Sequence, residues 1–535
     1  MKFKNKKNNR KENFSQKGDS ASPIDINELN EDKIDMNFIL TGIVDRIVQT
    51  GGPTVFYISD GTGSIAIKSF EGAGVRAHAN IVEGDLIKAE VSIGEFQDEL
   101  EGEVSRLTKL SDEEKQYFSE KIKKLERKRA EITPPEFLVK NIILDKLKEK
   151  YTQAAIEIRL AIIQNRPIII RHHNDTDGYS SGFSLERAIL PLIKEQHTSV
   201  KAAWEFYTRA PCAAPFYEIE DSIKDTAKSL SNEAKFSNKM PLVIIADNGS
   251  SQEDLMGIQQ GKVHGMDFIV VDHHFFEKDV ISNEVLVHIN PFLVGEDGKK
   301  FSAGMLCTEL ARFINPDVQN IEQIPAMAAF ADRIDNPEVV ENYFKIAEKK
   351  GYPKSLLEDI ASVIDFISSK LRFMEAREYI EVLFGEPMER QKALVKLMAP
   401  YIKKLENKGL EIAKSAVKIE KVGKTTIQVL EIEETFSRGF YPKPGKCIGL
   451  LHDNIQKEKD LDNVVSLGVL SDAITIRATE KSNFSIHDLI IYLNNHLKEA
   501  FVEGGGHKNA GAIKFLPNKK KLVLEKAISY IKSLS

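Results

Sequence analysis

Several acidic and histidine residues stand where a hydrophobic stretch of the sequence stops. They occur in "PIIIRHHNDTDGYSSG", "PLVIIADNGS", "FIVVDHH" and "AAFADRID", four stretches spread over residues 167–335. Carboxylates and imidazoles are costly to bury unless they are paired or coordinate a metal. The residues concerned are His173, Asp175, Asp177, Asp247, Asp272, His273, His274 and Asp332.

Divalent cations are the simplest way to neutralise such a cluster. Two carboxylates about 4 Å apart repel each other by about 4 kcal/mol at an effective dielectric constant of about 20. Aspartate with some imidazole suits Mn²⁺, with Mg²⁺ as the other candidate, and the lack of thiolate ligands argues against a structural zinc site. Two such ions activate water and clamp a phosphoryl group. The motifs therefore predict a metal-dependent site for phosphoryl chemistry.

Other interpretations of single motifs are weaker. Asp175, Asp177 and Glu186 match the calcium loop of an EF-hand in part, but Tyr179 and Ser180 occupy the positions of an oxygen ligand and of the invariant glycine. An aspartate after a strand is commonly a helix cap. The stretch "VGKTT" resembles a phosphate-binding loop but lacks its first glycine. The ordered set of motifs favours the metal site.

The elements that must position these residues are buried parallel strands. "PIII", "PLVIIA", "DFIVV" and "VLVHI" are almost continuously apolar and alternate with helical patterns, which is typical of a parallel sheet covered on both faces. In open α/β sheets, ligands bind at the carboxyl ends of the strands. We therefore expect the motif residues to converge on one cleft.

The remaining chain divides by pattern. Residues 36–110 predict five short strands with a turn at residues 61–63, an arrangement that resembles an OB-fold. Ser111 and Glu114 form a capping-box pattern before a charged helix. The expected organisation is a disordered basic tail (1–35), an OB-like barrel (36–110), a helical linker (111–164), a parallel-sheet domain (165–336), a helical connector (337–420) and a mixed α/β domain (421–535).

Composition narrows the class of protein. The 535 residues are 42% hydrophobic and 29% charged, with a net charge of −6, so any nucleic-acid site must be a local patch. Three distant cysteines form no CxxC pair, which indicates a reducing compartment. No apolar run is long enough to span a membrane, and the basic start lacks the apolar core of a signal peptide. We expect a cytoplasmic protein.

The stretch "EGGGHKNAGA", residues 503–512, is a second candidate site. Three consecutive glycines let backbone N–H groups approach an anion closely. A triple glycine alone is more often a turn. The histidine that follows and the charge of residues 421–535, with 17 Lys and Arg against 13 Asp and Glu, favour phosphate binding.

Taken in order, the motifs resemble those of the DHH–DHHA1 phosphoesterase superfamily. The resemblance covers about residues 165–335 and 421–535, and it includes Asp-x-Asp-Gly, Asp-Asn-Gly, Asp-His-His, a lone aspartate and "GGGHKNAGA". "RHHNDTDGYSSG" with the OB-like domain is similar to the archaeal RecJ-like exonucleases. Some members of that branch carry a zinc finger, which the scattered cysteines exclude here.

The resemblance implies roles for individual residues. His173, Asp175 and Asp247 would hold one metal ion, and Asp247 would bridge to a second. Bacterial RecJ has an aspartate at the position of His173. Asp272 would orient the histidine ligands and His274 would contact the scissile phosphate. The second ion would be held by Asp177, Asp247, His273 and Asp332, and the nucleotide by Arg477, Gly504, Gly505, Gly506 and His507.

Three functions are compatible with these expectations. The first is a two-metal exonuclease that degrades single-stranded DNA or RNA to mononucleotides, with replication or repair proteins as partners. The second is a phosphodiesterase of short oligonucleotides or cyclic dinucleotides, which needs no OB-like domain. The third is a Cdc45-like replication-complex scaffold, against which the complete set of metal ligands argues.

The OB-like segment has an unusual charge for a nucleic-acid-binding domain. Residues 36–110 hold 6 Lys and Arg against 11 Asp and Glu, whereas nucleic-acid grooves are normally basic. Phe56, Tyr57, Phe70 and Phe96 could stack on bases, but aromatic residues of a small barrel are more often core. Binding of nucleic acid on one hand, and contact with a protein or a structural role on the other, remain equal alternatives for this segment.

Overall fold

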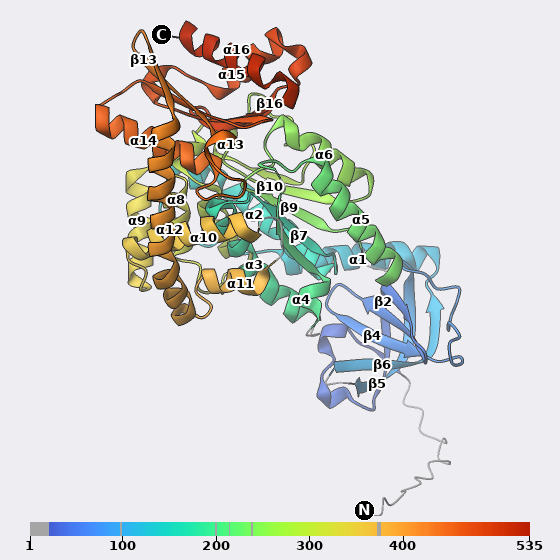
Figure 1. The fold of residues 1–535 in the computed structure, drawn as a ribbon. Coiled ribbons are helices and arrows are strands. Elements are labelled where there is room, and N and C mark those ends of the chain that lie inside the picture. The colour runs from blue at the N-terminus through green and yellow to red at the C-terminus, as the bar shows by residue number, and fades with distance from the viewer. Residues whose placement is uncertain are drawn as a thin grey trace, which may run out of the picture. The chain divides into compact units, whose positions relative to one another are not determined.

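The structure, a computed structural model, describes residues 21–96, 99–197, 201–212, 214–236, 239–371 and 376–534 (Figure 1). These residues form two compact units, one built mainly from residues up to Arg129 and one mainly from Ala130 onward. Within the described ranges, no helix is long and apolar enough to cross a membrane.

The first unit contains a closed barrel, as the sequence predicts. β2 pairs with both β3 and β5, and β4 pairs with β6, which closes the ring. Leu40, Phe56 and Ile67 are fully buried in its core, so Phe56 is not available to stack on a base. The strands are β2 (Asn37–Gln49), β3 (Thr54–Ser59), β4 (Ser64–Ser69), β5 (Leu86–Phe96) and β6 (Glu99–Lys109).

The segment before the barrel differs from the predicted disordered tail of residues 1–35. Residues 22–33 form β1 (Ser22–Pro23) and two short 3-10 helices, η1 (Ile26–Glu28) and η2 (Glu31–Lys33), while residues 1–20 lie outside the described ranges. Ile26 is buried against the barrel core, and its N–H donates to Asp60 Oδ2 at 2.7 Å. Apolar side chains within a polar stretch therefore anchor this segment.

Helix α1 (Asp112–Ala130) follows the barrel and begins as predicted. The Ser111 N–H donates to Glu114 Oε2 at 3.0 Å, and the Glu114 N–H donates to Ser111 Oγ at 3.4 Å. This reciprocal pair satisfies two backbone donors at the helix start.

The second unit is organised around a parallel sheet in the order β11-β10-β9-β7-β8 (Figure 1). The four predicted strands are present. The fifth, β8, was not predicted because its sequence "YTRAP" is short and partly polar. The sheet comprises β7 (Ile168–His172), β8 (Tyr207–Pro211), β9 (Leu242–Ala246), β10 (Asp267–Val271) and β11 (Val287–Ile289).

Helices and short turns connect and cover these strands. Residues of α2, α3 and α7 pack into the same hydrophobic core as the sheet. The helices are α2 (Ile142–Ile163), α3 (Thr176–His197), α4 (Ala202–Glu205), α5 (Ile219–Phe236), α6 (Gln252–Val263), α7 (Ala303–Ile314) and α8 (Ile324–Ala331), with 3-10 helices η3 (Pro291–Val294) and η4 (Gly298–Lys300).

The predicted helical connector is part of this core. Tyr343, Leu357 and Ile364 are fully buried and belong to the same apolar cluster as the parallel sheet. Their helical spacing gives each helix one apolar face, so the segment packs on the sheet domain instead of acting as a free spacer. Its helices are α9 (Pro337–Lys349), α10 (Lys354–Leu371), α11 (Arg377–Leu383) and α12 (Met388–Ala416).

The C-terminal part forms a mixed sheet in the order β12-β13-β14-β15-β17-β16, with a core of its own. The predicted fold class is thereby confirmed. The elements are β12 (Lys418–Val422), β13 (Thr425–Glu431), α13 (Ile432–Thr435), α14 (Pro444–Lys459), β14 (Val464–Val469), β15 (Ala473–Ala478), η5 (Glu480–Ser482), α15 (Ile486–His496), η6 (Lys498–Ala500), β16 (Glu503–His507), β17 (Ala510–Lys514), η7 (Pro517–Lys519) and α16 (Lys520–Ser533).

Candidate active site

The acidic motif residues lie at one edge of the parallel sheet. β7, β9 and β10 are neighbours and run in the same direction, so their carboxyl ends are side by side. Asp175 follows β7, Asp247 follows β9 and Asp272 follows β10. Asp332 reaches the same place from the C-terminal end of α8. The topology therefore gathers carboxylates that are far apart in the sequence.

One group of side chains consists of His173, Asp175 and Asp247. His173 Nδ1 lies 3.0 Å from Asp175 Oδ2 and 3.6 Å from Asp247 Oδ2. One ligand atom from each residue lies within 4.8 Å of the other two. Two carboxylates and an imidazole form a donor set that suits Mn²⁺.

A second group surrounds His273 Nε2. This nitrogen lies 3.4 Å from Asp247 Oδ1, 3.6 Å from Asp332 Oδ2 and 3.9 Å from Asp177 Oδ2. Asp247 therefore presents Oδ2 to the first group and Oδ1 to the second. Its φ of 62° lies in the left-handed region, which is uncommon for a residue other than glycine and is often found at functional sites.

Several atoms of these groups lack a hydrogen-bond partner among the described residues. Asp247 Oδ2, Asp332 Oδ2 and His273 Nε2 are buried and unpaired. Leaving a buried polar group unpaired costs about 1–3 kcal/mol, and here three such atoms lie in one cluster. Oxygen and imidazole atoms without partners are the groups that a divalent cation would bind, so the residues fit the predicted metal ions.

The charges of the cluster also favour bound cations. Burial, together with the charges of Asp247 and Asp332, raises the pKa of Asp177 well above its ordinary value. Aspartates this close cannot all be ionised without compensating positive charge. Divalent ions would supply that charge.

Asp272 orients the histidines that follow it. Its Oδ1 accepts hydrogen bonds from His274 Nδ1 at 2.8 Å and from the backbone N–H groups of His273 and His274 at 2.8 and 3.2 Å. Burial would raise the pKa of Asp272, but the neighbouring His274 outweighs this effect and lowers it. Asp272 is therefore ionised and fixes the ring of His274.

The N-terminus of α7 holds Asp177, a contact that sequence reasoning missed. The N–H groups of Ala303 and Gly304 donate to the two Asp177 oxygens at 2.9 and 3.1 Å. A Cβ atom at Gly304 would lie 2.8 Å from Asp177 Oδ1, so glycine permits this approach. The signal available in the sequence is "SAGM", a serine cap followed by two small residues.

Lys443 is a second residue that the sequence did not indicate. Its Nζ lies 3.2 Å from the Asn174 carbonyl oxygen, 3.3 Å from Ser368 Oγ and 3.0 Å from Asp365 Oδ1. It thus joins the loop after β7 to α10 and to the segment before α14. The lysine within "YPKPG" carries no pattern that would reveal this role.

The glycine motif lies in a strand and not in a turn. Gly504, Gly505 and Gly506 belong to β16, which pairs with β17 at the edge of the C-terminal sheet. A Cβ atom at Gly504 would lie 2.3 Å from the Ala512 carbonyl oxygen. The missing side chains therefore allow close backbone packing.

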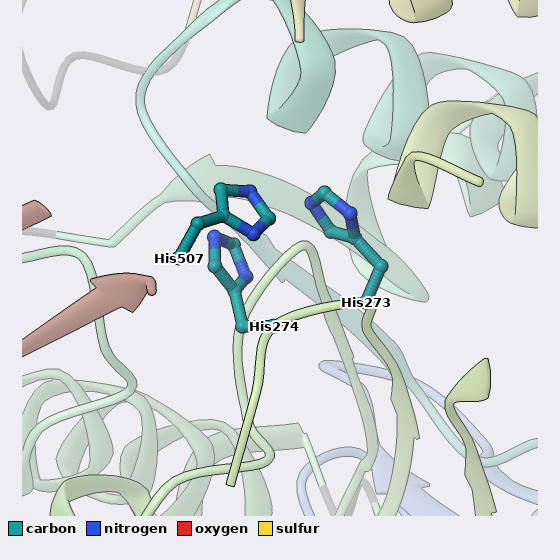
Figure 2. Close-up of side chains that lie close together, drawn as sticks. All are labelled: His273, His274 and His507. Atoms are coloured by element: carbon teal, nitrogen blue, oxygen red, sulfur yellow. The ribbon is translucent and has the colours of Figure 1, made fainter. Parts of the chain in front are cut away.

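His507, at the end of β16, meets the histidines of the parallel-sheet domain (Figure 2). Its ring centroid lies 5.0 Å from that of His273 and 5.1 Å from that of His274. Its Nε2 is 3.6 Å from Asp332 Oδ2. The two predicted sites thus form one site.

A cleft of about 600 Å³ joins these groups. Asp177 and His273 lie outside its lining. Its walls also include residues that were not predicted, among them Phe216, Phe275 and Ile490. The predicted site residues that line the cleft are His173, Asp175, Asp247, Asp272, His274, Asp332, Arg477, Gly504, Gly505, Gly506 and His507.

Comparison with known proteins identifies the family of the chain. The model of the DHH family, N-terminal domain, matches residues 167–331. The uncharacterized protein MJ1198 of Methanocaldococcus jannaschii is 36% identical over 524 residues, which are 92% of this chain and 68% of that protein. The chain belongs to the DHH family.

Similar solved structures include one that is close in sequence and fold and one that is more distant. The DHH domain of PF0399, described as a member of the s1p family of ribosomal proteins, is 35% identical with a TM-score of 0.75; the match covers 79% of this chain and 100% of that one. A manganese-bound exonuclease RecJ is 15% identical with a TM-score of 0.48 and covers 74% of this chain and 96% of its own.

Proposed function

We propose that this protein is a phosphodiesterase that uses two divalent metal ions and removes nucleotides from the end of single-stranded DNA or RNA. The observation that carries the proposal is the position of Asp247, whose two oxygens face two different groups of ligands. Divalent ions held there would activate water and stabilise the charge that develops on the phosphate.

The two ions would have different ligands. His173, Asp175 and Asp247 would bind one. Asp177, Asp247, His273 and Asp332 would bind the other. Mn²⁺ is the preferred ion and Mg²⁺ the alternative, because the donors are mainly carboxylates with a few imidazoles.

Other residues would bind and position the substrate. Asp272 holds the His274 ring in place, and His274 would contact the scissile phosphate. His507 lies beside it, so the two rings would approach the phosphate together. Arg477 and the backbone of residues 504–506 line the same cleft and would hold the nucleotide.

A single strand fits the surroundings of the cleft. Residues 421–535 have a positive charge balance, with 17 Lys and Arg against 13 Asp and Glu, and phosphate neutralisation supplies much of the affinity for nucleic acid. Phe216 and Phe275 in the cleft wall provide apolar surface against which a base can pack.

A second candidate is hydrolysis of short oligonucleotides or cyclic dinucleotides. The volume of the cleft, about 600 Å³, lies in the range of sites for single small ligands. The Cdc45-like scaffold is disfavoured because the chain retains every metal ligand that the family resemblance implies.

The test is digestion of 5′-labelled and 3′-labelled single-stranded DNA and RNA with Mn²⁺. We expect release of mononucleotides from one end and loss of activity with EDTA. Asp247→Ala should remove nearly all turnover while the protein stays folded. Cleavage of cyclic dinucleotides without cleavage of long strands would support the second candidate. Turnover by Asp247→Ala near the wild-type rate would refute the two-metal assignment.

A further inference from the structure

Three histidine rings lie close together in the candidate active site (Figure 2). His273 and His274 follow β10, and His507 ends β16. The ring centroids are 4.6 Å apart for His273 and His274, 5.0 Å for His273 and His507, and 5.1 Å for His274 and His507. One imidazole nitrogen of each ring lies within 4.8 Å of the other two.

The hydrogen bonds of two of these rings leave Nε2 available. His274 Nδ1 is bonded to Asp272 Oδ1 at 2.8 Å, and His273 Nδ1 to the Gly298 carbonyl oxygen at 3.2 Å. Histidines that bind metals usually bond a carboxylate or a carbonyl through the other ring nitrogen. His273 is 1% exposed, and its Nε2 has no hydrogen-bond partner among the described residues.

We propose that His273, His274 and His507 form a zinc site that competes with the second carboxylate-bound ion. Three imidazoles suit tetrahedral Zn²⁺, whose Zn–N bonds are about 2.0–2.1 Å long, so the rings would move closer together around the ion. Nitrogen ligands bind Zn²⁺ more tightly than Mn²⁺. Asp332 Oδ2, 3.6 Å from Nε2 of both His273 and His507, stands close enough to serve as a fourth ligand.

The two ions exclude each other because both positions need His273 Nε2. His273 Nε2 lies near Asp177, Asp247 and Asp332, and His273 also belongs to the group of three histidines; its Nδ1 is already bonded to the Gly298 carbonyl oxygen. A single nitrogen lone pair binds one ion. Zinc at the three histidines therefore removes a ligand from the second Mn²⁺ position.

Zinc would also change the state of the cleft. Bound zinc would connect the loop after β10 to the end of β16. It would also occupy the rings of His274 and His507, which are proposed to approach the phosphate. This consequence, inhibition of hydrolysis, rests on the proposed function. The preference of the three histidines for Zn²⁺ does not depend on the proposed function.

Titration of the metal-free full-length protein with Zn²⁺ and separately with Mn²⁺ tests the proposal. His507→Gln should weaken Zn²⁺ binding by at least about 10-fold and leave Mn²⁺ binding unchanged, because His507 is not a proposed Mn²⁺ ligand. His487→Gln, which alters a histidine of the same cleft outside the cluster, should change neither. Co²⁺ should give the intense visible absorption of a tetrahedral site in the wild type and lose it in His507→Gln.

A second arm tests the competition. Zn²⁺ added to the Mn²⁺-loaded protein should bind with release of one Mn²⁺. Unchanged Zn²⁺ affinity in His507→Gln would overturn the three-histidine site, and Zn²⁺ uptake with full retention of Mn²⁺ would overturn the exclusion. Neither result bears on strand digestion in Mn²⁺ alone, which tests the proposed function separately.

Discussion

At the scale of single residues, the site depends on atoms that hold other side chains in place. Asp272 Oδ1 accepts three hydrogen bonds from the two histidines that follow it. Asp177 is held in the same way by two N–H groups of α7. These contacts fix where the donor atoms point before any ion binds.

Asp272→Asn should reduce turnover without removing the metal ions. The amide keeps the shape of the side chain but loses the charge that holds His274, and loss of a group that orients a ligand costs about 10–100-fold. Measurement of kcat and of bound Mn²⁺ checks this. Asp279→Asn is the matched control, because Asp279 lies outside the proposed site and its side chain accepts a hydrogen bond from the Ser282 N–H. Loss of both ions in Asp272→Asn would show that Asp272 is itself a ligand.

At the scale of elements, the sequence predicted the strands that a local pattern of apolar residues marks. Apolar runs revealed β7, β9, β10 and β11, because strands buried on both faces leave a continuous signal. β8 is short and partly polar, so no such signal exists. The packing of α9–α12 into the core could not be predicted, because the sequence of an amphipathic helix does not indicate which surface its apolar face covers.

The site itself was predictable only in part. The convergence of Asp175, Asp247 and Asp272 was predictable, because each follows a parallel strand and ligands bind at the carboxyl ends of such strands. The approach of His507 to His273 joins two sheets, and only the family resemblance implied it. The contacts of Asp177 with α7 and of Lys443 with Asn174 link distant segments, and no local pattern carries such information.

The edge strand β16 gives a prediction about packing. Gly504→Ala should destabilise the protein by about 1–3 kcal/mol, because its Cβ atom would lie 2.3 Å from the Ala512 carbonyl oxygen. Gly445→Ala is the control, since a Cβ atom there meets nothing within 4 Å. Urea unfolding measures both. Equal stability of the two variants would mean that β16 does not pack on β17 as described.

Strand β11 gives a prediction about pH. Burial lowers the pKa of His288 to about 4, below its ordinary value of about 6.5. Between these values the unfolded chain binds a proton that the folded chain does not, so this stability is complete above pH of about 6.5 and is lost as the pH falls toward about 4.

The effect of His288 amounts to roughly 3 kcal/mol. His288→Gln should therefore lose less stability than the wild type over this pH range, as measured by urea unfolding at several pH values. The ring nitrogens of His288 lie 2.9 Å from Ser250 Oγ and Ser282 Oγ. Parallel curves of stability against pH for the two proteins would contradict the neutral state of His288.

At the scale of the whole molecule, all proposed ligands belong to the second unit. Deletion of residues 1–129 should leave hydrolysis of very short oligonucleotides intact, provided that thermal unfolding shows a folded product. Loss of that hydrolysis in a folded protein would place part of the site in the first unit.

The same deletion tests the role of the barrel. Phe70 and Phe96 are 66% and 54% exposed, and Lys68 Nζ lies 4.0 Å from the Phe96 ring centre. Loss of two stacked bases would cost about 2–6 kcal/mol at about 1–3 kcal/mol for each base. Weaker binding of long strands would indicate a nucleic-acid role, whereas unchanged affinity would indicate contact with a protein.

The bridging position of Asp247 is the central claim, and the stoichiometry of Mn²⁺ binding tests it most directly. Titration followed by electron paramagnetic resonance should show two Mn²⁺ ions for each wild-type chain, with the spin coupling of a carboxylate-bridged pair. Asp247→Asn should lose the coupled signal and bind fewer ions while it remains folded. Two coupled ions in Asp247→Asn, or a single ion in the wild type, would contradict the account.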